Sequence, residues 1–341
     1  MGRPKCFCST WREAPALVLK RATTASLMKH SAWLGFLVFA LGLWSPPTAQ
    51  AAPKPRLGVS LLTLTNPFFR DMGEAIQSEA AKHGMEAVVV SGEFDAARQR
   101  NQVADFIVQR VAALVLSPCD SKAVGSAIAA ANQAGIPVFT VDIAALEGGK
   151  VVCHVATDNL GGGRLAAQAL IEAVRGPAKI AILDFPEVES VILRTRGFEE
   201  ELARQQKENG VQLRIVARLP GGGAKEKSFK TTEDLLQAHP DLKGIFAIND
   251  PSALGAVAAL QKAGKLDQVR IVGFDGMPEG KAAIRAGHIY ADPVQFPERI
   301  GRTAVQQIRK YLDGDDVPAQ ILIPTALYRR ADAEKDPALE R

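Results

Sequence analysis

The sequence predicts an α/β fold made of two doubly wound, parallel-sheet (Rossmann-like) lobes. Apolar runs of four to seven residues recur along the chain and are nearly continuous, as in strands that are buried on both faces. Longer amphipathic stretches separate these runs, which implies helical crossovers between parallel strands. The pattern then occurs a second time, and the chain after residue 51 is longer than one core usually holds.

Residues 1–51 have the layout of a secretory signal peptide. An apolar run at 32–44 follows basic residues and precedes the small-residue sequence Ala49-Gln50-Ala51. The run is shorter than the roughly 20 apolar residues of a membrane span, so a cleaved signal is favoured over an anchor helix. Met28 is an alternative start, which would make the segment before it an over-long start. The sequence therefore predicts an exported protein.

The formal net charge of +4 belongs to this segment. Residues 1–51 hold six basic side chains and one acidic side chain, which leaves 35 basic and 36 acidic side chains in the rest. The predicted mature chain is close to neutral, and its composition does not indicate a nucleic-acid partner.

The first lobe is expected to begin at Arg56. Its predicted strands cover residues 56–62, 86–90, 112–116, 137–141 and 151–156. Its predicted helices cover 67–83 and 96–109, and a third follows Asp120. The first of these helices has Asn66 as N-cap and proline at its first position.

The second copy of the pattern begins after Asp158. Its predicted strands cover residues 179–184, 213–219, 244–248 and 270–274, and its helices cover 161–174, 190–208, 226–238, 251–263 and 278–286. The segment IYADPVQF at 289–296, a long helix at 297–312 and a strand-like segment at 321–328 complete the chain.

Two cysteines, Cys119 and Cys153, follow the predicted signal peptide. An oxidising compartment would permit a disulfide. However, Cys119 follows one predicted strand and Cys153 opens another, which puts them at opposite ends of a parallel sheet. We expect two partly buried thiols, although the sequence leaves their redox state open.

Polar side chains recur at the ends of predicted strands, where ligands of doubly wound sheets bind. They are Asp142, Asn249, Asp275 and Gln295, and Arg194 opens a helix of the second lobe. One such carboxylate is more often a turn residue, but recurrence in both halves favours a binding site. A carboxylate can accept hydrogen bonds from two neighbouring hydroxyls of a sugar.

The adjacent Phe68 and Phe69 cannot both lie in the middle of one buried helical stripe. At least one ring is therefore expected to face a cleft, where an aromatic face packs against the C–H face of a sugar. A helix start alone would explain Asn66 and the proline that follows, but not the second phenylalanine.

A dinucleotide-dependent enzyme is the main alternative. Gly161-Gly162-Gly163-Arg164-Leu165-Ala166 matches G-x-G-x-x-A, and Asp184 ends the next predicted strand. No acid and base pair for hydride chemistry is recognisable in the second half, and no metal-ligand spacing, G-x-S-x-G motif or P-loop is found. A sugar-sensing repressor would need a helix-turn-helix before Arg56, where the export signal lies instead. We expect no enzymatic activity, no cofactor and no metal.

Several long stretches carry a resemblance to a known family. They span nearly all of residues 56–328 and are LTNPFF (64–69), VDI (141–143), ATDNLGGG (156–163), LRTRGF (193–198), LLQAHPDLKGIFAINDPSALGA (235–256), VGFDGMPEG (272–280) and QFPERIG (295–301). The chain resembles the ribose-binding protein family of periplasmic sugar receptors, which are type I periplasmic binding proteins of ATP-binding cassette importers.

The resemblance implies a sugar cleft between two lobes that are joined by a three-segment hinge. The implied cleft residues are Asn66, Phe68, Phe69, Asp142, Arg194, Asn249, Asp275 and Gln295, with the phenylalanines sandwiching the sugar ring. The implied hinge residues are Thr157, Gln295 and Ala326. The implied lobes are residues 52–156 plus 296–323 and residues 157–295 plus 324–335.

Two positions depart from the family pattern. Ile143 stands where ribose-type receptors have an arginine, and Gly223 lies where they offer a further aromatic ring. The resemblance therefore implies a small carbohydrate or polyol as ligand, and not ribose in particular. It also implies a periplasmic monomer whose partner is a membrane permease, with a chemoreceptor or sensor kinase as the alternative partner.

Overall fold

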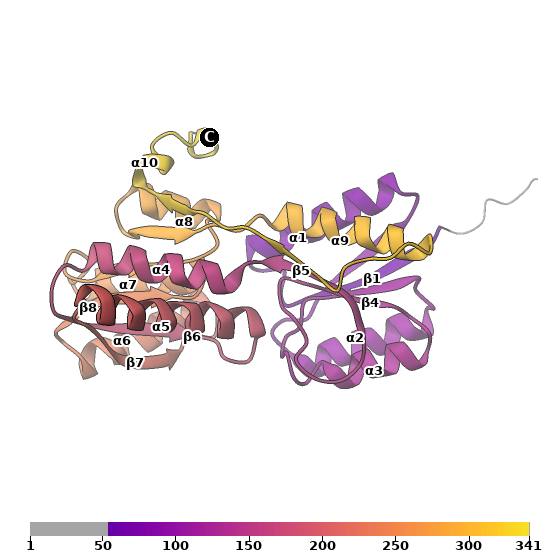
Figure 1. Ribbon diagram of the computed structural model, residues 1–341, viewed down its shortest axis with the longest axis horizontal. Helices are drawn as coiled ribbons and strands as arrows, with labels where there is room; N and C mark the ends of the chain where they lie inside the picture. Colours follow the sequence, from indigo (N-terminus) through magenta and orange to yellow (C-terminus); the bar gives the residue numbers. More distant parts are fainter. Residues whose placement is uncertain (1–53, 341) are drawn as a thin grey trace, which may run out of the picture. The chain divides into compact units, whose positions relative to one another are not determined.

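The computed structural model describes residues 54–340, which belong to one compact unit. The predicted signal peptide and the alternative start at Met28 lie outside the described residues. Within residues 54–340 no helix is both long enough and apolar enough to cross a membrane. Two six-stranded sheets, each flanked by helices, confirm the predicted fold class (Figure 1).

The first sheet has the strand order β11-β5-β4-β3-β1-β2, and all of its neighbouring strands are parallel. Its strands are β1 (Arg56–Leu61), β2 (Glu86–Ser91), β3 (Ala113–Leu116), β4 (Val138–Val141), β5 (Val151–Thr157) and β11 (Gln320–Ile323). The order reverses direction beside β1, as expected for a doubly wound sheet. We call this sheet and the helices that pack on it the first lobe.

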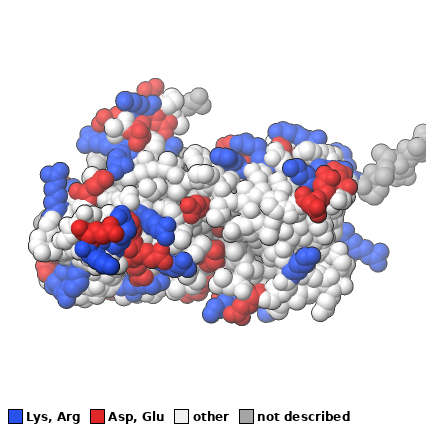
Figure 2. Space-filling view, in the orientation of Figure 1, with Lys and Arg blue, Asp and Glu red and all other residues white. Residues whose placement is uncertain are grey.

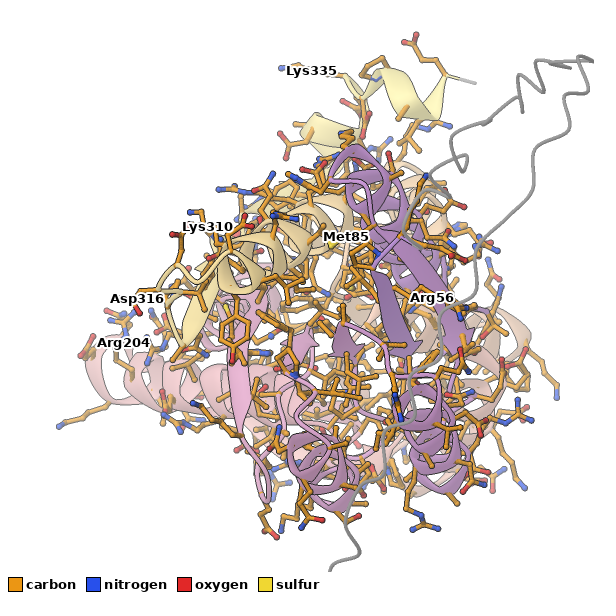
Figure 3. All side chains as sticks on the ribbon, turned by 90° about the vertical axis from the view of Figure 1, so that its right-hand side faces the viewer. Arg56, Met85, Arg204, Lys310, Asp316 and Lys335 are labelled. Atoms are coloured by element: carbon orange, nitrogen blue, oxygen red, sulfur yellow. The ribbon has the colours of Figure 1, made fainter. Side chains whose placement is uncertain are left out.

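Helices α1 (Pro67–Lys82) and α9 (Pro297–Leu312) pack together on one side of this sheet, and α2 (Ala96–Val108) and α3 (Gly125–Gln133) lie on the other (Figure 1). The Asn66 side chain accepts a hydrogen bond from the Phe68 amide, and Pro67 occupies the first turn, so α1 begins where the sequence predicts. In Figure 3 Met85 lies among the buried side chains, whereas Lys310 on α9 extends away from the helix.

The second sheet has the order β12-β10-β9-β8-β6-β7 and is parallel except for the antiparallel pair β10 and β12. Its strands are β6 (Ala178–Asp184), β7 (Leu213–Pro220), β8 (Leu242–Ala247), β9 (Arg270–Val272), β10 (Ala291–Pro293) and β12 (Leu327–Arg329). Its helices are α4 (Asn159–Ala173), α5 (Glu189–Asn209), α6 (Lys225–Ala238), α7 (Asp250–Lys262), α8 (Pro278–Arg285) and the short α10 (Arg330–Ala333), followed by the 3-10 turn η1 (Pro337–Leu339). We call this sheet and its helices the second lobe.

Strand β6 shows why its apolar run is continuous. Ile180 and Ile182 belong to the apolar cluster that includes α4 and α5, whereas Ala181 and Leu183 belong to the cluster that includes α6, α7 and α8. Successive side chains of a strand point to opposite faces, and here helices cover both faces. The outer surface is mixed in charge: on the face shown in Figure 2, Lys and Arg side chains lie beside Asp and Glu side chains.

Three connections join the two sheets: β5 to α4, β10 to α9, and β11 to β12. The strand-like segment at 321–328 is thus two strands in different sheets, and only Ala291–Pro293 of the segment at 289–296 is a strand. The connections are hydrogen bonded to one another, from the Asp158 amide to the Ile323 carbonyl at 2.9 Å and from the Val294 amide to the Ala326 carbonyl at 2.9 Å.

Thr157, Gln295 and Ala326 lie in or beside these three connections. Their position is the one that a hinge between the lobes requires. A hinge motion at these residues stays a prediction, as do the lobe bounds that the family resemblance implies.

Both cysteines of residues 54–340 are free and buried. Cys119 follows β3 and Cys153 lies within β5. That they stay unpaired in the oxidised protein stays a prediction.

Candidate ligand-binding site

The structure brings all eight predicted cleft residues to the lining of one cavity, whose water-accessible volume is about 30 Å³. Asn66, Phe68, Phe69 and Asp142 come from the first lobe, Arg194, Asn249 and Asp275 come from the second, and Gln295 comes from the connection between β10 and α9. A few polar groups that converge within a largely apolar lining are the usual composition of a small-molecule site.

Two aspartates that follow strands have unusual backbone conformations. Asp142, just after β4, has a φ of 62°, and Asp275, which follows β9, has a φ of 106°. Left-handed backbone is costly for residues other than glycine, and such residues cluster at binding sites. The Asp275 backbone is held there by two hydrogen bonds, from its amide to the Pro293 carbonyl at 3.0 Å and from the Gln295 amide to its carbonyl at 2.8 Å.

Arg194 on α5 is the central cation of the cavity, and the protein fixes its position. Its Nε donates to Asn159 Oδ1 at 2.8 Å, and its Nη1 donates to the Ile248 carbonyl at 2.8 Å. The guanidinium carbon lies 3.9 Å from the centre of the Phe274 ring. Stacking and fixed hydrogen bonds pre-organise a guanidinium, so a ligand need not order this side chain.

Both aspartates face this guanidinium. Arg194 Nη1 lies 3.3 Å from Asp275 Oδ1, and Nη2 lies 4.0 Å from Asp142 Oδ1. Asp275 Oδ1 also accepts a hydrogen bond from Gln295 Nε2 at 2.7 Å. The site thus combines one guanidinium with carboxyl groups from both lobes.

Two acceptor atoms at the site are buried without a hydrogen-bond partner among the described residues. They are Asp142 Oδ1 and Gln295 Oε1. Buried acceptors without partners are rare in folded proteins because they lose their bonds to water. Hydroxyl groups of a ligand are suitable donors to both atoms.

Burial changes the acidity of both aspartates. Desolvation raises the pKa of Asp142 to about 7, against the opposing effect of Arg194, and the nearby Asp275 raises it further. Desolvation also raises the pKa of Asp275 to about 6, while Arg194 and Gln295 lower it. Donors supplied by a ligand would favour the charged form of each carboxyl group.

Phe68 and Phe69 both line the cavity and are only 2% and 5% exposed. Their ring centres are 5.1 Å apart and their planes are 89° apart. The expectation that these two rings sandwich a sugar is wrong for this conformation, because perpendicular rings offer no pair of parallel faces. A ligand ring stacked on one of them would meet the edge of the other.

The cavity is also lined by residues that the sequence pattern did not indicate. They are Leu62, Phe94, Phe185, Val188, Ser190, Val191 and Ile248, and both departures from the family pattern, Ile143 and Gly223, also line it. Phe185 directly follows β6, so the rule applied to the other strand ends would have found it. Phe94 has a φ of 59° in the loop after β2, and no sequence pattern indicates that conformation.

The glycines of the possible dinucleotide motif have a packing role. A Cβ atom at Gly163 would overlap the carbonyl oxygen of Arg194, and one at Gly162 would lie 2.5 Å from the Phe274 ring. These glycines therefore allow α4 to approach α5 and β9 closely. The carboxyl group of Asp184 is occupied by Thr195 Oγ1 at 3.0 Å and Arg218 Nε at 2.5 Å, which leaves it no role toward a ribose.

Comparison with known proteins agrees with this geometry. The family model described as "periplasmic binding protein domain" matches residues 57–316. The ribose import binding protein of Salmonella typhimurium is 36% identical over 288 residues, which cover 84% of this chain and 95% of the relative. That of Bacillus subtilis is 36% identical over 298 residues, which cover 86% and 94%.

Solved structures give the same result. The Caulobacter myo-inositol binding protein bound to myo-inositol superposes with a TM-score of 0.77 at 26% identity, over 85% of this chain and 98% of that protein. A solute-binding protein of Actinobacillus succinogenes with bound D-allose gives a TM-score of 0.75 at 26% identity, over 83% and 100%. From its fold, its cavity and these matches, the chain belongs to the periplasmic binding protein family.

Proposed function

We propose that this chain is the periplasmic substrate-binding component of an ATP-binding cassette importer, and that it binds a small sugar or polyol in the cavity between its lobes. The observation that carries the proposal is the enclosed cavity in which Arg194 lies between Asp142 of the first lobe and Asp275 of the second. The eight residues named from the sequence are the proposed ligand contacts.

The chemistry of the cavity favours a neutral polyhydroxylated ligand. Its carboxyl groups and the free Gln295 Oε1 need donors, and vicinal hydroxyls supply them. Hydrogen bonds to charged groups contribute about 1.5 to 3 kcal/mol each, so three or four of them reach the roughly 8 kcal/mol of micromolar binding. The relative that imports ribose and the solved structures with bound myo-inositol and D-allose support this class.

Hinge closure is the proposed mechanism. A ligand that binds one lobe first would gain its remaining hydrogen bonds when the other lobe closes, and only this difference in contacts can favour the closed form. The lobes also touch directly away from the three connections. The Ser121 amide donates to the Glu187 carbonyl at 3.0 Å, and the Glu189 amide donates to Ser121 Oγ at 2.9 Å.

The proposed partner of the closed form is a membrane permease. The protein would act as a monomer in the periplasm after removal of residues 1–51, and it would release its ligand chemically unchanged. The alternative partner is a chemoreceptor or sensor kinase that recognises the closed lobes. The ligand would then bind in the same cavity, and the protein would act in signalling in place of transport.

A thermal-shift screen of the purified protein tests this function. The probes are D-ribose, D-allose, D-galactose, myo-inositol, xylitol and, as a negatively charged control, D-glucuronate. A ligand at about 100 times its dissociation constant adds about 2.7 kcal/mol of stability, which raises the unfolding temperature by several degrees. Failure of every neutral sugar and polyol to shift the wild-type protein would contradict the proposal.

A further inference from the structure

The polar groups of the cavity are concentrated at its most buried part. Asp142, Arg194 and Asp275 are each only 2–3% exposed and lie within hydrogen-bond or ion-pair distance of one another through the guanidinium. Gln295, 6% exposed, bonds to this group through Asp275. A ligand that uses these groups places its hydroxyl-rich part there.

Two aromatic side chains line the more exposed part of the cavity. Phe94 from the first lobe is 38% exposed, and its ring centre lies 6.2 Å from that of the half-buried Phe185 from the second lobe. The Val188 amide donates to the Phe185 carbonyl at 3.4 Å, so Phe185 and Val188 share one turn. We call Phe94 and Phe185 the outer wall; both line the cavity, as does the fully buried Val188, which is 1% exposed.

Gly223 makes room for Phe185. A Cβ atom at this position would lie 3.3 Å from both Phe185 Cδ1 and Asn249 Nδ2, and the φ of 66° also favours glycine. Asn249 is partly engaged within the protein: its Oδ1 accepts from the Ser252 amide and its Nδ2 donates to the Gly223 carbonyl, which leaves a second N–H for a ligand. Phe185 thus supplies an aromatic side chain beside a loop that carries none at Gly221, Gly222 and Gly223.

We propose that the outer wall receives an apolar end of the ligand, so that the preferred substrate is a deoxy sugar whose methyl group faces Phe94 and Phe185. This inference rests on the proposed function and narrows its substrate class. A hydroxyl group packed against these two rings would give up bonds to water without gaining a partner from them, whereas a methyl group gains contact with both rings. A hydroxylated end would instead need Ser190, the cavity-lining hydroxyl two residues after Val188.

Isothermal titration with pairs of sugars that differ in one hydroxyl tests this inference. The pairs are D-fucose with D-galactose, L-rhamnose with L-mannose, and 5-deoxy-D-ribose with D-ribose. In at least one pair we expect the deoxy sugar to bind about tenfold more tightly, which corresponds to about 1.4 kcal/mol. Equal or tighter binding of the hydroxylated sugar in every pair that binds would overturn the inference and leave the proposed function intact. No binding by any of the six sugars would also overturn the inference, and the proposed function itself would be refuted only if every neutral sugar and polyol of the thermal-shift screen failed as well.

Two variants show which residues carry the preference. Phe185→Ala should reduce the tenfold preference to near one, and Ser190→Ala should leave it unchanged. If Phe185→Ala kept the tenfold preference for the deoxy sugar, the outer wall would not be the source of that preference. Since Phe185 is only partly buried, the variant should fold, and its unfolding temperature without ligand checks this; Phe94→Ala provides a second, independent variant.

Discussion

Arg194 of the second lobe lies 4.0 Å from Asp142 of the first lobe, measured from Nη2 to Oδ1, and each side chain is 4% exposed. Its Nη1 lies 3.3 Å from Asp275, which belongs to the second lobe. One fixed guanidinium thus faces carboxyl groups from both sides of the cavity. Any ligand that bonds to both aspartates would be bound by both lobes at once.

Asp275→Ala should raise the dissociation constant for the bound sugar at least tenfold, because one charge-assisted hydrogen bond contributes about 1.5 to 3 kcal/mol. Titration calorimetry with the sugar that gives the largest thermal shift measures this change. Asp241→Ala is the matched control: this aspartate lies in the same lobe, is paired with Lys179 and is exposed, so affinity should not change. Unchanged affinity in Asp275→Ala would remove this residue from the site.

Sugar affinity should rise with pH between about 5 and 8, by roughly tenfold, because burial raises the pKa of Asp142 to about 7 in the free protein. At the low end of this range the group is protonated and accepts hydrogen bonds weakly; at the high end it is a carboxylate. Asp142→Asn cannot ionise at this position, so its affinity should be lower at high pH and should depend less on pH, with the remaining dependence near pH 6, where Asp275 titrates. If the wild type and Asp142→Asn gave parallel profiles, Asp142 would not be the titrating group.

A second pair of buried carboxyl groups should make unfolding stability depend on pH. Asp250 and Asp292 are 2% and 0% exposed, and burial raises the pKa of both, that of Asp292 to about 6. The folded-state pKa of each lies above the unfolded value near 3.8, so their stabilising effect is complete below about pH 4 and is lost as pH rises, for Asp292 through about pH 6. The loss is on the order of 1–3 kcal/mol.

Urea unfolding of the ligand-free protein across this pH range measures that effect. The comparison is with Asp292→Asn, which should gain stability relative to the wild type as pH rises, because it removes one of the two buried charges. Asp241→Asn, exposed in the same lobe, should follow the wild type at all pH values. A constant difference between Asp292→Asn and the wild type would show that this pair does not titrate on unfolding.

The close approach of α4 and α5 should be sensitive to a single methyl group. A Cβ atom at Gly163 would overlap the Arg194 carbonyl oxygen, so Gly163→Ala must shift α5 and with it the Arg194 guanidinium. Overpacking of this kind costs about 1–3 kcal/mol. The unfolding temperature and the sugar affinity of Gly163→Ala should therefore both fall. Lys207→Ala, at an exposed position of α5, should change neither quantity. A Gly163→Ala variant with normal stability and affinity would contradict this packing role.

The strand-end rule explains why so much of the cavity could be predicted from sequence. Asp142, Asn249 and Asp275 follow buried parallel strands, and such strands present their carboxyl ends to one edge whatever the surrounding side chains are. Chain order therefore brings Asn249 and Asp275 to one edge of the second sheet and Asp142 to one edge of the first, whereas their meeting in one cavity requires the two lobes to face each other. Phe185 obeys the same rule, but an aromatic side chain after a strand is not by itself a sign of a polar binding site.

Other features depend on contacts that sequence does not encode locally. The 89° angle between Phe68 and Phe69 is set by packing in the core, and the pairing of Phe94 with Phe185 requires the two lobes to meet. Residues 321–328 likewise divide into β11, which pairs with the first sheet, and β12, which pairs with the second, and this division depends on where the two sheets lie. A periodic pattern cannot show which sheet a short apolar segment joins.

Both thiols of the described chain should be inert in the folded protein. Cys119 is 4% and Cys153 is 0% exposed, and burial raises their pKa values to about 12 and about 11. Because the thiolate is the reactive form, alkylation by iodoacetamide at about pH 8 should be far slower than for a free thiol, whose pKa is about 8.5. Mass spectrometry of the peptides that contain these two residues measures the alkylation. Both cysteines should be unmodified in the native protein. Both should be alkylated in concentrated guanidinium chloride without any reductant. A requirement for reductant would mean that a disulfide joins them, and rapid native labelling of Cys119 would mean that the loops after β2 and β3 open readily.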